Sequence, residues 1–250
     1  MKFIGIIPAR YDSTRFPGKP LAMIRGKTMI QRVYEQTKKA LPEVYVATDD
    51  KRIEQAVKNF SGNVVMTSAN HRSGTDRIRE ASDNITGNKN RNHEVIVNIQ
   101  GDEPFIQPEQ ICELTKCFND ENTEIATLIK PINNQETLFN PNLPKVITDK
   151  NHYAIYFSRS TIPYIRNKEA SEWLNSYPFH KHIGIYAYRK HILNEITSLE
   201  PSPLELAESL EQNRWIENGY RIKTAITNHE NYPVDTPEDL EKIVSTLFPE

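Results

Sequence analysis

Residues 8–20 gather positive charge into a stretch that is stiffened by proline. The stretch follows a short apolar run and holds Arg10, Arg15 and Lys19 together with three prolines. Proline restricts the backbone and so lowers the entropy cost of bringing these cations onto one polyanion. The pattern indicates a triphosphate site, and a solvated basic loop is the alternative interpretation of the same composition.

Two familiar phosphate-binding motifs are absent from the sequence. A Walker A loop needs a glycine five residues before its Gly-Lys pair, but Ser13 stands at that distance from Gly18, and Leu21 from Gly26. The sequence also lacks a Gly-x-Gly-x-x-Gly fingerprint for a dinucleotide. A polyphosphate site here would therefore depend on the cations themselves.

Two carboxylates come directly after a second apolar stretch. Residues 94–100 are typical of a buried strand, and Gly101, Asp102 and Glu103 follow. Ligands bind beyond the carboxyl ends of parallel strands, where Mg²⁺ takes one or two carboxylates together with phosphate oxygens and water. We expect Asp102 to be a magnesium ligand, although an aspartate after a glycine also suits an ordinary turn.

Two further segments are expected at the same edge of the sheet. Residues 68–77 are rich in small polar side chains, and Gly74 would let a nucleobase approach the backbone; these residues equally suit a helix-capping turn. Asp235 stands just before a helix start at Thr236. It could share a metal ion with Asp102, or act only in the cap of that helix.

Alternating strands and helices must position these segments. The first half alternates between the two in the way that builds a mostly parallel sheet with helices on both faces. The expected strands are residues 3–7, 44–48, 64–67, 94–100 and 124–132. Helices are expected at residues 28–40 and 75–85, between a cap at Asp49 or Asp50 and residue 60, and from Pro108 onward. The Asn-rich stretch 84–92 is expected to be a loop.

The pattern changes after Pro144, where long polar connections separate short apolar stretches. This change predicts a smaller antiparallel lobe. The expected strands are residues 145–148, 153–158, 184–188 and 221–227, and the expected helices are 190–198, 204–218 and one that starts at Thr236.

Composition narrows the class of protein. The 250 residues, 37% of them hydrophobic, can fill a globular core. A formal net charge of −2 indicates neither a nucleic-acid nor a membrane partner, and the apolar run at the N-terminus is too short for a signal peptide or a membrane span. Cys112 and Cys117 are expected to be reduced structural thiols. We expect a cytoplasmic protein.

Four segments, residues 8–20, 71–77, 98–104 and 234–240, follow one another along the chain. Together they resemble the family of 3-deoxy-manno-octulosonate (Kdo) cytidylyltransferases, the CMP-Kdo synthetases. The basic loop of residues 8–20 is shared by several sugar cytidylyltransferases. Likeness to the Kdo enzymes in particular extends over nearly the whole chain and includes residues 156–163, 182–189 and 203–212.

The resemblance implies a Rossmann-like nucleotidyltransferase fold and a homodimer. It implies an enzyme that uses Mg²⁺ to convert CTP and Kdo into CMP-Kdo and pyrophosphate for lipopolysaccharide synthesis. It also divides one domain, residues 1–250, into a nucleotide-binding part at about 1–132, a sugar-binding and dimer part at 145–230, and a C-terminal helix at 231–250 that returns to the core.

The resemblance further implies roles for individual residues. Lys19, Arg10 and Asp102 would be catalytic, and Asp102 and Asp235 would bind Mg²⁺. The nucleotide would contact Ala9, Arg10, Ser13, Arg15, Lys19, Arg72, Ser73, Gly74 and Gln100. The sugar would contact Arg159, His182, Tyr188, Glu211 and Gln212.

Two alternatives stay open at this point. A synthetase for another acidic sugar, such as a sialic acid, would share the CTP half of the site. A nucleotide-binding sensor would keep the fold without turnover, although a sensor does not need carboxylates aligned for a metal.

Overall fold

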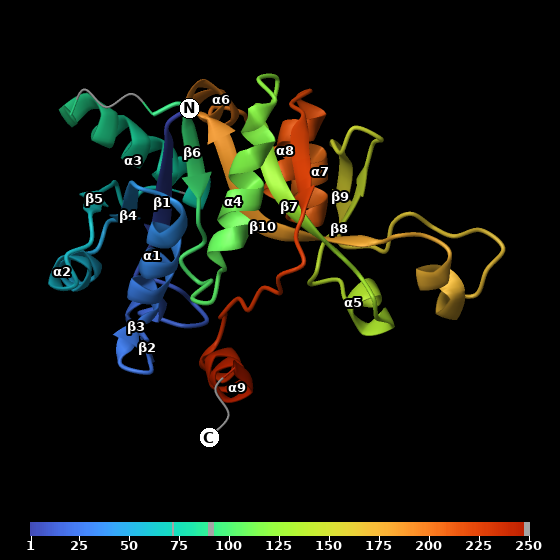
Figure 1. The fold of residues 1–250 in the computed structure, drawn as a ribbon, viewed down its shortest axis with the longest axis horizontal. Coiled ribbons are helices and arrows are strands. Elements are labelled where there is room, and N and C mark those ends of the chain that lie inside the picture. Colours follow the sequence, from blue (N-terminus) through green and yellow to red (C-terminus); the bar gives the residue numbers. More distant parts are fainter. Residues whose placement is uncertain (72, 90–92, 248–250) are drawn as a thin grey trace. The chain divides into compact units, whose positions relative to one another are not determined.

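The computed structural model describes residues 1–71, 73–89 and 93–247, and the chain divides into two compact units. The first unit comprises Met1–Ile111, Arg189–Thr197 and Glu230–Glu250. The second comprises Cys112–Tyr188 and Ser198–His229. Figure 1 shows the helices and strands of the chain, coloured from the N-terminus to the C-terminus. The C-terminal segment thus belongs to the same unit as the N-terminal strand.

The first unit contains a parallel sheet. Its strands lie in the order β6 (Val95–Asn98), β1 (Phe3–Ala9), β4 (Val44–Thr48) and β5 (Val64–Met66) (Figure 1). Every residue of β4 and β6 is buried, as continuous apolar runs predict for a sheet covered on both sides. Because the strands are parallel, the loops after them emerge at one edge.

Helices cover both faces of this sheet, as predicted. A Cβ atom added to Gly5 would lie 3.0 Å from Thr37 and Leu41, which belong to and follow α1 (Met29–Ala40). Pro8 points to the opposite face because strand residues alternate. There it lies against Gly74, the first residue of α3 (Gly74–Lys89). The remaining helices of this unit are α2 (Lys51–Asn59), α6 (Lys190–Ile196) and α9 (Pro237–Leu247).

Capping residues set the starts of these helices. The Thr28 hydroxyl accepts the Gln31 N–H at the start of α1, and Asp50, one of the two predicted candidates, accepts the N–H groups of Arg52 and Ile53 at the start of α2. The prediction of a loop from residue 84 was wrong as far as Lys89, because α3 continues through the buried Ile85. Residues 90–92 of that predicted loop lie outside the described part of the chain.

The second unit has the predicted antiparallel character. Antiparallel pairs join β7 (Ile125–Pro131) to β10 (His180–Arg189), β10 to β8 (Lys145–Thr148), and β8 to β9 (Ala154–Ser158), while β11 (Ile222–Ile226) runs parallel to β7. The predicted strand 184–188 is too short. Residues 180–183 also pair with β7, but the polar side chains of residues 180–182 hide the strand from a hydrophobicity pattern.

The predicted helix 204–218 is two helices, α7 (Pro203–Glu208) and α8 (Glu211–Glu217). Ser209 separates them with a left-handed backbone, φ 51°. The Glu208 carboxylate accepts hydrogen bonds from Tyr156 Oη and Ser158 Oγ on β9, at 3.0 and 2.6 Å. These tertiary bonds outweigh the local preference for a continuous helix.

Several short elements had no signal in the sequence. They are the hairpin of β2 (Met23–Ile24) and β3 (Lys27–Thr28), the helix α5 (Gln135–Phe139) and the short 3₁₀ helices Lys19–Leu21, Cys117–Asn119 and Ala170–Asn175, all too short to show periodicity. The helix α4 (Pro108–Lys116) begins at Pro108 as predicted. Among the described residues, no helix is long and apolar enough to cross a membrane.

Candidate active site

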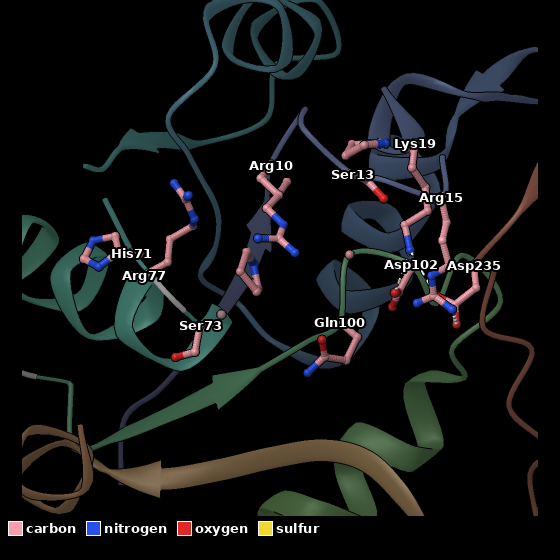
Figure 2. A pocket seen from close by; sticks show the side chains of 15 residues that line it. Arg10, Ser13, Arg15, Lys19, His71, Ser73, Arg77, Gln100, Asp102 and Asp235 are labelled. Carbon is pink, nitrogen blue, oxygen red and sulfur yellow. Dashed lines mark hydrogen bonds and ion pairs between the residues drawn. The ribbon is translucent and has the colours of Figure 1, made fainter. Parts of the chain in front are cut away.

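A cavity of about 280 Å³ lies in the first unit at the carboxyl ends of β1 and β6. Figure 2 shows Lys19, Arg15, Asp102 and Asp235 gathered on one side of it, with Arg10 between this group and His71. Its lining includes every described residue that was predicted to bind nucleotide or metal: Ala9, Arg10, Ser13, Arg15, Lys19, Ser73, Gly74, Gln100, Asp102 and Asp235. Arg72, predicted to bind nucleotide, lies outside the described residues.

Lys19 connects the two acids. Its Nζ atom lies 2.9 Å from Asp102 Oδ2 and 3.5 Å from Asp235 Oδ1. Arg15 Nη1 lies 3.1 Å from the other oxygen of Asp235. Two carboxylates from distant parts of the sequence therefore converge on a single cationic atom.

Backbone contacts bring these loops together. The Val234 N–H donates to the Asp102 carbonyl at 3.0 Å, and the Val234 carbonyl accepts from Lys19 Nζ at 2.9 Å. Gly101 has no space for a side chain, because a Cβ atom there would lie 2.7 Å from the Pro8 carbonyl oxygen. The Asp102 loop can therefore pass close to the basic loop only with glycine at this position.

The basic loop is folded tightly upon itself. Gly18 takes a positive φ of 72°, and its N–H donates to the Tyr11 carbonyl at 2.9 Å. The Tyr11 ring in turn packs under the Arg52 guanidinium, with 3.2 Å between the Arg52 Cζ atom and the ring centroid. This closed loop positions Lys19, the next residue, at the cavity wall.

Two residues on the opposite side of the cavity, Arg77 and His71, were not predicted as site residues from the sequence. The buried Arg77 guanidinium donates to Thr67 Oγ1 at 2.6 Å and to Asp49 Oδ2 at 3.1 Å. Thr67 and Asp49 each directly follow a strand, β5 and β4, so the strand-end rule that found Asp102 also points to these partners. His71 is hydrogen-bonded to Glu80.

The surroundings keep Glu80 ionised beside His71. Burial alone would raise the pKa of Glu80, but the hydrogen bonds from the Ser68 N–H and from His71 hold that pKa below its ordinary value. The bonds to Glu80 therefore tie Ser68 and His71 to α3. Ser73 and Asp76 also cap one another at the start of α3, each side chain accepting the other's N–H.

The donor set of the cavity suits Mg²⁺. The described residues contain no cluster of three or more histidine, cysteine, aspartate or glutamate side chains that would hold a metal by themselves. Asp102 and Asp235 supply hard carboxylate oxygens that already converge on one cationic atom, Lys19 Nζ. Mg²⁺ usually takes one or two carboxylates and completes its shell with substrate phosphates and water, so these two residues fit a shared ion.

The residues predicted to contact the sugar lie in the second unit. Arg159 donates to the carbonyls of Glu208, Ser209 and Pro141 through its Nε, Nη2 and Nη1 atoms, at 2.7, 3.4 and 3.2 Å. A guanidinium has five N–H donors, so it keeps capacity for an acidic ligand after these bonds. The same bonds hold the turn that precedes Glu211 and Gln212.

Aromatic rings surround His182 in this unit. Its ring meets Phe157 edge-on at 5.0 Å and lies 5.3 Å from Tyr186, and Nε2 is 3.0 Å from Thr127 Oγ1. The Thr127 hydroxyl also lies 2.8 Å from the Ile185 carbonyl, to which it donates. It therefore accepts from His182 Nε2, which leaves Nδ1 as an acceptor.

Tyr188 and Gln212 are buried close to this cluster. The Tyr188 ring is fully buried, stacked 5.8 Å from Tyr186 and edge-on to Trp215 at 5.6 Å. Its part in sugar binding stays a prediction, because this packing also suits a core residue. Gln212 is 6% exposed, and its Nε2 atom has no hydrogen-bond partner within the described part of the chain. A buried, unpaired amide is costly, and a polar ligand would satisfy it.

Burial lowers the pKa of His182 to about 3, so the folded protein holds a neutral ring near pH 7. The folded pKa lies below the unfolded value, and the unfolded chain therefore takes up a proton first as the pH falls. We expect wild type to lose about 2 kcal/mol more stability than His182→Gln between pH 7 and pH 5. Urea unfolding at both pH values measures the difference, and parallel losses would contradict it.

A family model described as Cytidylyltransferase matches residues 4–224. The chain belongs to this family of nucleotide-transferring enzymes. One relative, the 3-deoxy-manno-octulosonate cytidylyltransferase of Parabacteroides distasonis, is 63% identical over 99% of this chain and 98% of its own. The 3-deoxy-manno-octulosonate cytidylyltransferase of Bacteroides thetaiotaomicron is 59% identical over 96% of this chain and 96% of its own. A solved CMP:2-keto-3-deoxy-manno-octonic acid synthetase complexed with CTP is 41% identical, with a TM-score of 0.89 over 99% of this chain and 98% of its own.

Proposed function

We propose that this protein joins Kdo to CMP, using CTP and releasing pyrophosphate. The observation that carries the proposal is the convergence of Arg10, Arg15 and Lys19 with Asp102 and Asp235 around one cavity of the first unit. The relatives named for this activity match the chain over nearly its full length, which supports the same choice of nucleotide and sugar.

In this proposal the triphosphate lies against the basic loop. Arg10, Arg15 and Lys19 provide the charge, and the loop is already folded, so little entropy is lost when the polyanion binds. Ser73, Gly74 and Gln100 face the cytosine from the other loops of the cavity. Ala9 allows the nucleotide to approach its backbone closely, and Ser13 offers its hydroxyl group to the nucleotide.

The reaction is an in-line attack of the anomeric hydroxyl of the sugar on the α-phosphorus of CTP. The new oxygen–phosphorus bond forms while the bond to the pyrophosphate oxygen breaks, and the hydroxyl proton is released to water, so negative charge grows on the leaving group. Lys19, which Asp102, Asp235 and the Val234 carbonyl hold in place, and Arg10, which lines the same cavity, put positive charge where that charge develops, and such charge lowers the barrier.

Asp102 and Asp235 would hold Mg²⁺ in this site. The ion, when bound, would neutralise phosphate charge and so assist displacement. Lys19 has to exchange at least one of its carboxylate contacts for a phosphate contact when the nucleotide enters, because its Nζ atom now lies between the two acids.

The second unit supplies the contacts to the sugar. Kdo carries one carboxylate and several hydroxyls, which require a cation and a set of neutral donors and acceptors. Arg159 offers the cation, neutral His182 an acceptor at Nδ1, and Gln212 an unused donor. Glu211 and Tyr188 complete the predicted set. That the enzyme is a cytoplasmic homodimer that serves lipopolysaccharide synthesis remains part of this proposal.

The choice of sugar is tested by pyrophosphate release with CTP, Mg²⁺ and a panel of 2-keto sugar acids. We expect release with Kdo to exceed that with a sialic acid by at least about 100-fold in kcat/KM, because a mismatched polar ligand leaves buried groups unpaired. The reverse order would favour the sialic-acid alternative. CTP binding without pyrophosphate release from any sugar would favour a sensor.

A further inference from the structure

A partly buried hydrogen-bond network involves residues close in sequence to the two acids of the cavity. Asn231 Nδ2 donates to Glu103 Oε1 at 3.0 Å, and Asn231 Oδ1 accepts from Gln110 Nε2 at 2.9 Å. Gln110 Oε1 in turn accepts the Gln107 N–H at 3.0 Å. Glu103 and Gln110 are only 8% and 1% exposed. The Asn231 amide therefore links two segments that are far apart in the sequence and that the bond from the Val234 N–H to the Asp102 carbonyl also joins.

The positions of these residues connect the network to the acids. Glu103 directly follows Asp102, and Asn231 precedes Asp235 by a short, proline-containing stretch. Within that stretch Val234 is fully buried against Ile24 and Met29. Any sliding or rotation of residues 231–234 would thus carry the Asp235 carboxylate away from Asp102.

Polar contacts suit this task better than apolar ones. Apolar packing of the Val234 side chain is not directional. The bond from the Val234 N–H to the Asp102 carbonyl and a hydrogen bond at each end of the Asn231 amide together fix distance and orientation. On the far side, Asp239 Oδ2 accepts the N–H groups of Asp235 and Thr236 at 3.1 and 2.9 Å. Asp235 is therefore held from both directions along the chain.

We propose that Asn231 and Glu103 are positioning residues, which hold the Asp235 segment in register with Asp102 so that both carboxylates serve one Mg²⁺ ion. This inference rests on the proposed function of the cavity. Neither residue lines the cavity, and both act through the carboxylate next to them in the chain.

The network allows a test by exchange of donor and acceptor. Asn231→Asp places a second carboxylate against Glu103 with almost no change in shape. Adding Glu103→Gln restores the bond in the opposite direction and returns the net charge to that of wild type. We measure the Mg²⁺ concentration that gives half-maximal turnover, and amide hydrogen exchange of residues 232–236 in the full-length protein without ligands.

For Asn231→Asp we expect the half-saturating Mg²⁺ concentration to rise at least about tenfold, because a buried hydrogen bond is replaced by repulsion. Exchange in residues 232–236 should also become faster. The double variant should return both values to within about threefold of wild type, since the bond is made again. A purely structural role would change thermal stability without changing the Mg²⁺ requirement.

Two results would overturn the inference: unchanged Mg²⁺ requirement and exchange in Asn231→Asp, or no recovery in the double variant. Should Asn231→Asp not fold, Gln110→Leu removes the second bond of Asn231, together with the bond from the Gln107 N–H, and must shift both values in the same direction. Absence of pyrophosphate release from wild type would refute the proposed function instead. The exchange measurement needs no substrate and would still decide whether the network holds the segment.

Discussion

Replacing Lys19 with alanine is expected to lower turnover by at least about 10²-fold, because one preorganised donor at a developing charge is typically worth 10² to 10³. The Lys19 Nζ atom lies at the meeting point of Asp102, Asp235 and the Val234 carbonyl, inside the cavity that is proposed for the triphosphate. Measurement of kcat with saturating CTP and Kdo gives the effect.

The control is a lysine that forms a similar ion pair elsewhere. Lys27 Nζ lies 2.6 Å from Glu35 Oε2 and does not line the active-site cavity. Lys27→Ala should therefore leave kcat close to wild type. Circular dichroism should show that Lys19→Ala keeps its fold, since the side chains of Asp102 and Asp235 are 30% and 43% exposed and can be solvated, and Asp235 keeps its ion pair with Arg15. Near-wild-type turnover in Lys19→Ala would remove Lys19 from the mechanism.

Asp102→Asn is expected to lower turnover by a similar factor, at least about 10²-fold, for a different reason. The amide keeps the shape of the side chain but removes the negative charge, so Mg²⁺ would lose one of its two carboxylates. The loss should therefore be accompanied by a higher Mg²⁺ concentration for half-maximal turnover. Steady-state kinetics over a series of Mg²⁺ concentrations separates the two effects.

Glu35→Gln is the matched control for the acid. Glu35 also pairs with a lysine, and its pKa is held below the ordinary value by hydrogen bonds from Lys27 and Gln31, although burial alone would raise it. Its replacement changes charge by the same amount at a distance from the cavity. If Asp102→Asn and Glu35→Gln had equal kcat and equal Mg²⁺ requirement, Asp102 would have no role in metal binding.

The cavity was largely predictable because strand ends are predictable. Continuous apolar runs marked β1 and β6, and the polar residues directly after them, such as Arg10 and Asp102, had to emerge at one edge of a parallel sheet. The position of Asp235 was harder to predict, since no strand directly precedes it. Its placement depends on Val234, whose side chain and backbone join Ile24 and Asp102.

Other features depend on tertiary contacts that a sequence pattern does not contain. The break at Ser209 arises from Glu208, which bonds to β9 and thereby sets Glu211 at the start of a new helix. The mostly polar first half of β10 is a strand because β7 and β8 pair with it. The ion pair between Lys19 and both acids likewise appears only when three separate loops fold together.

One measurement tests the central claim most directly: a crystal structure of this protein with CTP and Mg²⁺. We expect the triphosphate in the cavity of the first unit, in contact with Arg10, Arg15 and Lys19, and one Mg²⁺ ion bound by oxygens of both Asp102 and Asp235. A triphosphate bound elsewhere, or an ion that neither carboxylate contacts, would contradict the proposed site.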